Sequence, residues 1–147
     1  MFPKLLIIPL LAGVGTQVIK FLLQAVRGEL RWSTLQEYGG MPSAHTAFVV
    51  SLTTVVGLHD GWQSTSFAIS TIFSLLIVRD AIGFRQFLGQ HGRILNVLIR
   101  ELPQRQEREV PIQLVERLGH TPLQAIVGGI IGLVVGLLLY QWLPASW

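Results

Sequence analysis

Long apolar runs separated by shorter polar stretches dominate the hydrophobic pattern of this chain. The first run covers residues 5–26, and the last run, residues 122–143, carries no charged residue. Both reach the roughly 20 residues that a membrane-spanning helix needs. Two further runs, residues 42–58 and 65–84, are shorter or carry charges near one end. The pattern predicts an all-α, polytopic transmembrane bundle of about four spans.

The stretch between the third and fourth runs follows a different pattern. Residues 85–119 are rich in arginine, and their large apolar residues recur at helical spacing around Ile94, Leu95, Leu98 and Leu102. An arginine-rich helix with one apolar face is typical of segments that lie in the membrane interface. We therefore expect an interfacial amphipathic helix in this stretch.

The composition is that of a membrane protein rather than of a soluble domain. Hydrophobic residues make up 50% of the chain and charged residues only 13%, whereas soluble domains contain about 25% charged residues. The net charge of +3 does not predict nucleic-acid binding, because the arginines lie between apolar runs. The absence of cysteine excludes disulfides, thiolate catalysis and cysteine-ligated metal sites. We predict one membrane-embedded domain, residues 1–147, without a metal or a cofactor.

The positive charges are distributed unevenly over the polar stretches. With four spans, residues 27–41 and 85–119 lie on one side of the bilayer and hold most of the arginines, whereas the other side has Lys4 alone. Because cationic loops stay in the cytoplasm, this side is predicted to be cytoplasmic and both termini to face outward. Four ionisable residues fall near the cytoplasmic helix ends: Lys20, His45, Asp80 and His120.

A pair of cations marks the end of the first run. Lys20 and Arg27 are seven residues apart, so they lie on one helical face, two turns from each other. A planar guanidinium and a compact ammonium can together hold a phosphate. In the alternative interpretation, both side chains extend to lipid headgroups.

The sequence GGMPSAH at residues 39–45 opens the second run. Its glycines permit close backbone approach, and Ser43 is placed to cap the helix that follows Pro42. Free backbone amides at such a helix start bind anions. His45, in the first turn, can donate a proton to a leaving oxygen. The alternative is a helix-end histidine that is bonded to a neighbouring loop.

The third run ends in RDAIGFR, which places Asp80 between two arginines. Asp80 can pair with Arg79, Arg85 or Lys20. A purely structural ion pair is the alternative to a role in chemistry, because an unpaired charge at this depth is costly.

His120 stands directly before the last run, in the sequence LGHTP. A neutral imidazole here can attack phosphorus and form a phosphohistidine, which splits hydrolysis into two easier steps. Gln124, one turn later, can accept a hydrogen bond from the other ring nitrogen. The alternative is that His120 only caps the helix. His59 and His91 lie in loop-like polar contexts, and we expect both to be solvated.

The last run also contains a stripe of small residues that permits close helix packing. Its members are Gly128, Gly129, Gly132 and Gly136. We expect this stripe to support a homo-oligomer.

Three blocks in order resemble the signature of the type 2 phosphatidic acid phosphatase and vanadium haloperoxidase superfamily. The blocks are Lys20-x6-Arg27, Pro42-Ser43-Ala44-His45 and His120-x3-Gln124, followed by Gly128 and Gly132. The sequences GGMPSAH, RDAIGFR and LGHTPL are more similar to its small divergent branch, the acid phosphatase/vanadium-dependent haloperoxidase-related proteins. The resemblance covers nearly the whole chain.

The resemblance implies a membrane phosphatase that hydrolyses a phosphate monoester or diphosphate of a lipid through a phosphohistidine. It implies phosphate binding by Lys20, Arg27 and Ser43, general acid catalysis by His45, and nucleophilic attack by His120. The expected partners are a membrane lipid and a small phosphate-containing substrate. Vanadate, a mimic of the five-coordinate phosphoryl species, is expected to inhibit.

The sequence departs from the superfamily pattern in two respects. Gln113 and Leu114 occupy the places of a Ser-Arg pair, so we expect Arg85, or as the second candidate Arg79, to supply the phosphate-binding arginine. Gln124 stands where an aspartate normally orients the nucleophile, and Asp80 is the candidate to compensate. These departures support an alternative function, a non-catalytic membrane protein that binds phosphate or anionic headgroups. A haloperoxidase is a third interpretation.

Overall fold

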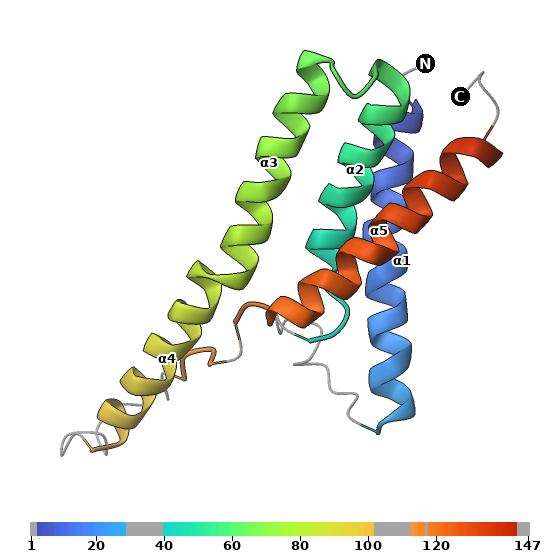
Figure 1. Cartoon of the computed structure of the whole chain (residues 1–147). Helices are drawn as coiled ribbons and strands as arrows, with labels where there is room; N and C mark the ends of the chain where they lie inside the picture. The colour runs from blue at the N-terminus through green and yellow to red at the C-terminus, as the bar shows by residue number, and fades with distance from the viewer. Residues whose placement is uncertain (1–2, 29–39, 102–112, 117, 144–147) are drawn as a thin grey trace.

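The computed structural model describes residues 3–28, 40–101, 113–116 and 118–143. Within these ranges the chain forms helices and no strand, which confirms the predicted all-α architecture. The helices are α1 (Pro3–Val26), α2 (Ala44–Asp60), α3 (Thr65–Ile82), α4 (Phe84–Glu101) and α5 (Pro122–Trp142) (Figure 1). Each predicted apolar run corresponds to one helix. A helix satisfies its backbone hydrogen bonds internally, so a long apolar segment can lie in lipid in this form.

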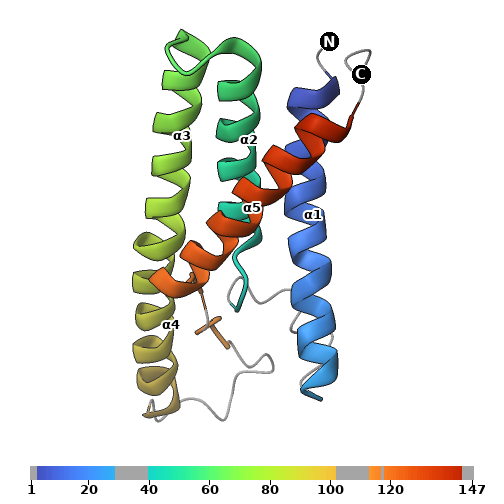
Figure 2. The same cartoon turned by 45° about the vertical axis from the view of Figure 1, so that its right-hand side comes forward.

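Helix α2 forms the centre of the bundle and packs against α1, α3 and α5. Helix α5 runs obliquely across α2 and α1, as two views of the ribbon show (Figures 1 and 2). At one end of the bundle, the Lys4 ammonium donates a 2.6 Å hydrogen bond to the Leu143 carbonyl oxygen. This bond joins the start of α1 to the end of α5.

Helix α5 approaches α2 closely because glycines occupy its contact face. A Cβ atom on Gly128 would collide with the carbonyl oxygen of Ser43, and one on Gly132 would collide with that of Ala47. Gly128, Gly132 and Gly136 are buried against α2. The predicted small-residue packing is confirmed, but it occurs within one chain. The homo-oligomer that we expect this stripe to support stays a prediction.

Helices α3 and α4 follow one another almost without a break, with Gly83 between them (Figure 1). The Gly83 N–H donates to the Arg79 carbonyl oxygen at 2.8 Å, and the Phe87 N–H donates to the Gly83 carbonyl oxygen at 3.2 Å. Helical hydrogen bonding therefore continues through the junction. The predicted amphipathic helix is confirmed over Phe84–Glu101, although Leu102 lies outside the described residues. Its position in the membrane interface stays a prediction.

Three segments of the described chain are long and apolar enough to cross a membrane. They are Lys4–Val26, Thr65–Glu101 and Pro122–Trp142. Helix α2 has 17 residues, which rise about 26 Å, slightly less than the roughly 30 Å hydrocarbon core. Because α2 packs against α1, α3 and α5, less of its surface faces lipid, and its apolar segment can be shorter than those of the other helices. The architecture is consistent with about four spans.

Candidate functional site

The starts of α2 and α5 meet inside the bundle. Ser43, which precedes α2, donates its backbone N–H to the carbonyl oxygen of Gln124 in the first turn of α5 (3.2 Å). This contact places His45 and His120 next to each other, with ring centroids 6.4 Å apart. Two histidines that are distant in the sequence therefore lie at one level of the molecule.

A pocket of about 500 Å³ lies beside the two histidines, between α1, α2 and α3. Lys20, His45 and His120 form its ionisable wall. The apolar part of the lining includes Leu10, Val14, Phe48, Phe73 and Ile77. The pocket is thus amphipathic, with cationic and imidazole groups against one part and hydrocarbon side chains along the other.

Lys20 is buried in the pocket wall, with only 5% of its surface exposed. Its side chain passes close to the backbone of Gly40, where a Cβ atom would lie 3.0 Å from the Lys20 Cε and 3.6 Å from the Nζ. Gly40 also has a φ of +99°, which side chains other than glycine rarely adopt. A glycine at residue 40 therefore lets the ammonium lie beside the histidines. A buried positive charge in this position favours an anionic ligand.

His120 is fixed through its backbone and its ring. Its N–H donates to the Ala81 carbonyl oxygen at 2.8 Å, and its own carbonyl oxygen accepts from the Gln86 Nε2 at 2.8 Å. The ring Nδ1 lies 3.2 Å from the Gly40 carbonyl oxygen. Because a carbonyl oxygen can only accept, this contact favours the tautomer with hydrogen on Nδ1. The lone pair of the neutral ring is then on Nε2.

The surroundings of His120 keep its imidazole neutral. Burial is the largest influence and lowers the pKa of His120. A hydrogen bond with the Gln124 side chain opposes this effect, and the charges of His45 and Lys20 lower the pKa further. Desolvation and nearby positive charge both disfavour the imidazolium. His120 is therefore neutral near pH 7, which is the state that a nucleophile requires.

Asp80 and Arg85 form an ion pair next to this pocket. The Arg85 Nε donates to the Asp80 Oδ2 at 2.7 Å, with side chains that are 33% and 41% exposed, respectively. This geometry selects Arg85 among the three partners predicted for Asp80. Both side chains line a second, smaller pocket of about 320 Å³ and neither lines the Lys20 pocket. Among the described hydrogen bonds, none joins Asp80 to His120.

Ser43 serves as the cap of α2, as the sequence predicted. Its hydroxyl accepts a 3.4 Å hydrogen bond from the Thr46 N–H and lies 3.0 Å from the Thr46 hydroxyl. Ser43 is fully buried and does not line the pocket, although its neighbours Pro42 and Ala44 do. The predicted contact of the Ser43 hydroxyl with phosphate stays a prediction.

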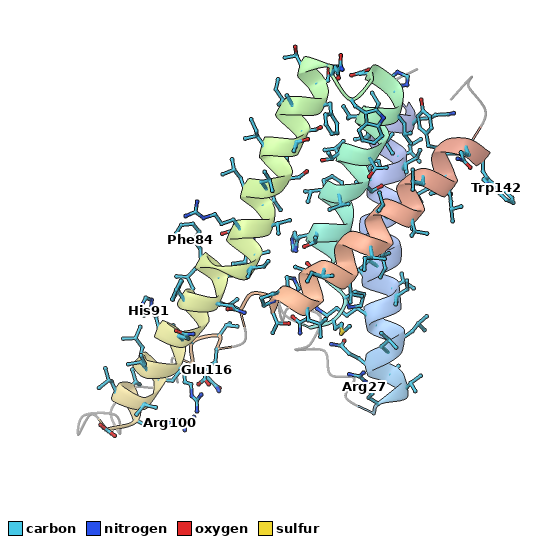
Figure 3. The ribbon with its side chains drawn as sticks, viewed as in Figure 1. Arg27, Phe84, His91, Arg100, Glu116 and Trp142 are labelled. Atoms are coloured by element: carbon cyan, nitrogen blue, oxygen red, sulfur yellow. The ribbon has the colours of Figure 1, made fainter. Side chains whose placement is uncertain are left out.

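Arg27 lies beyond the end of α1 and is exposed. Figure 3 shows it at the tip of α1, away from the helix starts where the histidines meet. His91 is exposed on α4, as predicted, whereas the His59 Nδ1 lies 3.5 Å from the Tyr140 hydroxyl. Of the predicted site residues, the pocket thus brings together Lys20, His45 and His120.

Comparison with known proteins places this site in a family context. The profile of the family described as "Divergent PAP2 family" matches residues 2–135, which include every predicted site residue. The chain belongs to the divergent PAP2 family. A relative from Bacillus subtilis (strain 168), named "Uncharacterized membrane protein YuiD", is 36% identical over 141 residues, covering 88% of this chain and 89% of the relative. No solved structure matches the chain.

The family assignment confirms the resemblance carried by the three sequence blocks, and the chain is a membrane protein of the PAP2 type. In this divergent PAP2 protein, Gln124 has a structural function at the start of α5. Its Oε1 accepts the Thr121 N–H at 3.0 Å, while the Thr121 hydroxyl accepts the Gln124 N–H at 3.3 Å. This reciprocal pair is a capping box.

The acceptor at the Nδ1 of His120 is the carbonyl oxygen of Gly40. The sequence analysis assigned an orienting role to Gln124, whose side chain also hydrogen-bonds with His120, and, as compensation, to Asp80. Asp80 is instead bonded to Arg85. A backbone carbonyl can fix the ring tautomer as a carboxylate does, but it adds no negative charge to stabilise an imidazolium.

Proposed function

We propose that this divergent PAP2 protein is a membrane phosphatase that hydrolyses a phosphate monoester or diphosphate of a lipid through a phosphohistidine at His120. One observation carries the proposal: a neutral, buried His120 lines the same pocket as the ammonium of Lys20 and the imidazole of His45. A nucleophile, a cation and a second proton-transfer group are the parts that such a reaction needs.

The proposed reaction begins with attack of the His120 Nε2 on phosphorus. The P–N bond forms as the P–O bond to the leaving group breaks, and the leaving oxygen takes a proton from protonated His45. Water then attacks the phosphohistidine and gives a proton to His45, and the P–N bond breaks to release inorganic phosphate and regenerate neutral His120. Lys20 stabilises the negative charge on the phosphoryl oxygens in both steps.

The apolar part of the pocket supports a lipid substrate. With the phosphate at Lys20, a hydrocarbon chain can lie against Phe48 and Phe73, which line the same pocket. The arginine-rich stretches between the predicted spans support a site that opens toward the cytoplasmic side of the membrane.

Phosphate release from lipid phosphates tests this proposal. The purified full-length protein, in detergent, is expected to release inorganic phosphate from a short-chain phosphatidic acid or a prenyl diphosphate. Orthovanadate is expected to inhibit, because it adopts the five-coordinate geometry of the phosphoryl species. No release from a panel of monoesters and diphosphates, under conditions where the protein is folded, would contradict the proposal.

A second candidate function is phosphate or headgroup binding without turnover. Two observations favour it: Gln124 replaces the orienting aspartate of the superfamily, and Arg85 lies outside the Lys20 pocket. Saturable binding of a lipid phosphate to the detergent-solubilised protein, with no release of inorganic phosphate, would identify this function.

Substituting Lys20 by methionine is expected to raise the KM for a lipid phosphate about 10-fold to 100-fold, because a hydrogen bond to a charged group contributes about 1.5–3 kcal/mol. The measurement is steady-state phosphate release over a range of substrate concentrations. Lys20→Arg keeps the charge and should lose less affinity. Lys4→Met removes a buried lysine of the same helix that does not line the pocket. An equal rise in KM for Lys4→Met and Lys20→Met would contradict a specific role of Lys20.

A further inference from the structure

The segment that leads to His120 is attached to α4. Asn96, which is buried, donates its Nδ2 to the Leu114 carbonyl oxygen at 2.9 Å and to the Glu116 Oε1 at 2.8 Å. Its Oδ1 accepts the Leu114 N–H at 2.9 Å. One side-chain amide therefore pairs with both backbone groups of Leu114, as a neighbouring strand would.

Two glycines allow this segment to lie directly on α4. A Cβ atom on Gly89 would be 2.5 Å from the Glu116 carbonyl oxygen, and one on Gly92 would be 2.7 Å from that of Val115. Both glycines are buried on the same helical face as Asn96. Figure 3 shows Glu116 on the side of α4 that faces the bundle, opposite Phe84 and His91. The segment and α4 thus form one packed unit.

The same unit holds the backbone of His120. The Gln86 Nε2, in the first turn of α4, donates to the His120 carbonyl oxygen, and the Ala81 carbonyl oxygen at the end of α3 accepts the His120 N–H, each at 2.8 Å. Gly119 has a φ of +86°, and a Cβ there would be 2.8 Å from the Gln86 backbone nitrogen. Both backbone groups of His120 are therefore bound to the α3–α4 junction.

We propose that Gln86 is a positioning residue for His120, and that Asn96 fixes the segment that carries it. The catalytic consequence rests on the function proposed above. His120 lies outside α5, whose first turn is closed by the capping box of Thr121 and Gln124. The direction of the imidazole therefore depends on contacts made by residues 119 and 120, and among these the Gln86 side chain is the donor to the His120 carbonyl oxygen.

The loss of this amide should affect the rate more than the binding of substrate. Without the Gln86 donor, the carbonyl oxygen of His120 loses its partner, and the backbone can move away from α4. A shift of about 1 Å in a catalytic group can reduce the rate about 100-fold. Lys20, which is on α1, and the apolar pocket wall do not depend on Gln86. The change should therefore appear in kcat and not in KM.

The test uses Gln86→Met and Gln86→Glu in the full-length protein in detergent. Both keep the approximate shape of the side chain, and both remove the N–H donor. We expect kcat for phosphate release to fall about 10-fold to 100-fold, with KM within about twofold of the original protein. The matched control is Gln90→Met, an exposed glutamine one turn later on α4, which should change neither constant.

A second readout does not depend on turnover. In protein labelled with ¹⁵N-histidine, the ring signals of His120, assigned by their loss in His120→Ala, report which ring nitrogen carries hydrogen. We expect mainly the Nδ1–H tautomer in the original protein and in Gln90→Met, and a mixture of tautomers in both Gln86 variants. If kcat and the ring signals of the Gln86 variants match those of Gln90→Met, the proposal is wrong. If the original protein lacks turnover, the proposed function fails and the ring signals alone decide whether Gln86 positions His120.

Discussion

Replacing His120 by alanine is expected to reduce phosphate release to the background rate, a loss of about 10⁴-fold or more, as for other enzymes that lose a covalent nucleophile. The physical reason is that Nε2 is the atom that forms the P–N bond in the proposed reaction. Lys20 and His45 would still line the pocket, so a lipid phosphate should still bind. The measurement is phosphate release by the purified variant under saturating substrate.

The variant His45→Ala distinguishes the role of the general acid from the role of the nucleophile. A leaving group of low pKa does not need a proton donor, so the first step with an aryl phosphate, release of the phenol as the phosphohistidine forms, should be nearly as fast in His45→Ala as in the original protein. A lipid phosphate has a poor leaving group, and its hydrolysis should be slow in the same variant. His120→Ala should be inactive toward both substrates.

The matched control is His59→Ala, because His59 lies at the other end of α2 and is not part of the pocket. It should keep normal activity toward both substrates. If both His120→Ala and His45→Ala still release phosphate from a lipid phosphate, the proposed mechanism is wrong. Retained lipid binding without turnover in every variant, and in the original protein, would instead favour the binding function.

The convergence of Lys20, His45 and His120 was predictable from the sequence for a physical reason. Bilayer thickness fixes the length of a spanning helix, so residues at corresponding ends of successive apolar runs must lie at a similar depth. The sequence blocks place these three residues at such ends. Depth does not determine which residues share a pocket, and the structure shows that Arg85 lines a neighbouring one.

Arg27 illustrates where helical periodicity is insufficient. A spacing of seven residues places Lys20 and Arg27 on one face, but it also separates them by about 10 Å along the helix axis. Helix α1 extends past the starts of α2 and α5 (Figure 2), so Arg27 lies beyond the level of the histidines. The periodicity of α1 contains no information about where the neighbouring helices begin.

The groups that fix His120 were not predictable from residue types. The acceptor at its Nδ1 is the backbone carbonyl oxygen of Gly40, and every residue has such a group. Gln86 and Asn96 are polar residues on an amphipathic helix, where solvent exposure is the ordinary expectation. Their function depends on residues 113–116 and 118–120, which lie along α4 and have no periodic pattern of their own.

Replacing Gly132 by alanine is expected to destabilise the bundle by about 1–3 kcal/mol, the usual cost of overpacking. The added Cβ would collide with the carbonyl oxygen, carbonyl carbon and Cα of Ala47. These are backbone atoms in the first turn of α2, so they cannot move as a flexible side chain can. The two helices must separate instead, and the close packing along the glycine stripe is lost.

Gly129→Ala is the matched control, since it makes the same chemical change three residues earlier on α5. Its Cβ would lie 3.6 Å from the nearest atom, the Thr46 Cγ2, which is an ordinary contact. Alanine favours a helix over glycine by about 1 kcal/mol, so this variant should be as stable as the original protein or more stable. Thermal unfolding in detergent, followed by circular dichroism, measures both variants.

The separation of α5 from α2 should also reach the site. The Ser43 N–H bonds to the Gln124 carbonyl oxygen, and this contact brings His45 beside His120. Gly132→Ala should therefore lower both the unfolding temperature and the rate of phosphate release, whereas Gly129→Ala should lower neither. If both variants unfold at the same temperature, the contact between Gly132 and Ala47 does not limit the approach of the helices. The glycine stripe would then have a function other than helix packing within one chain.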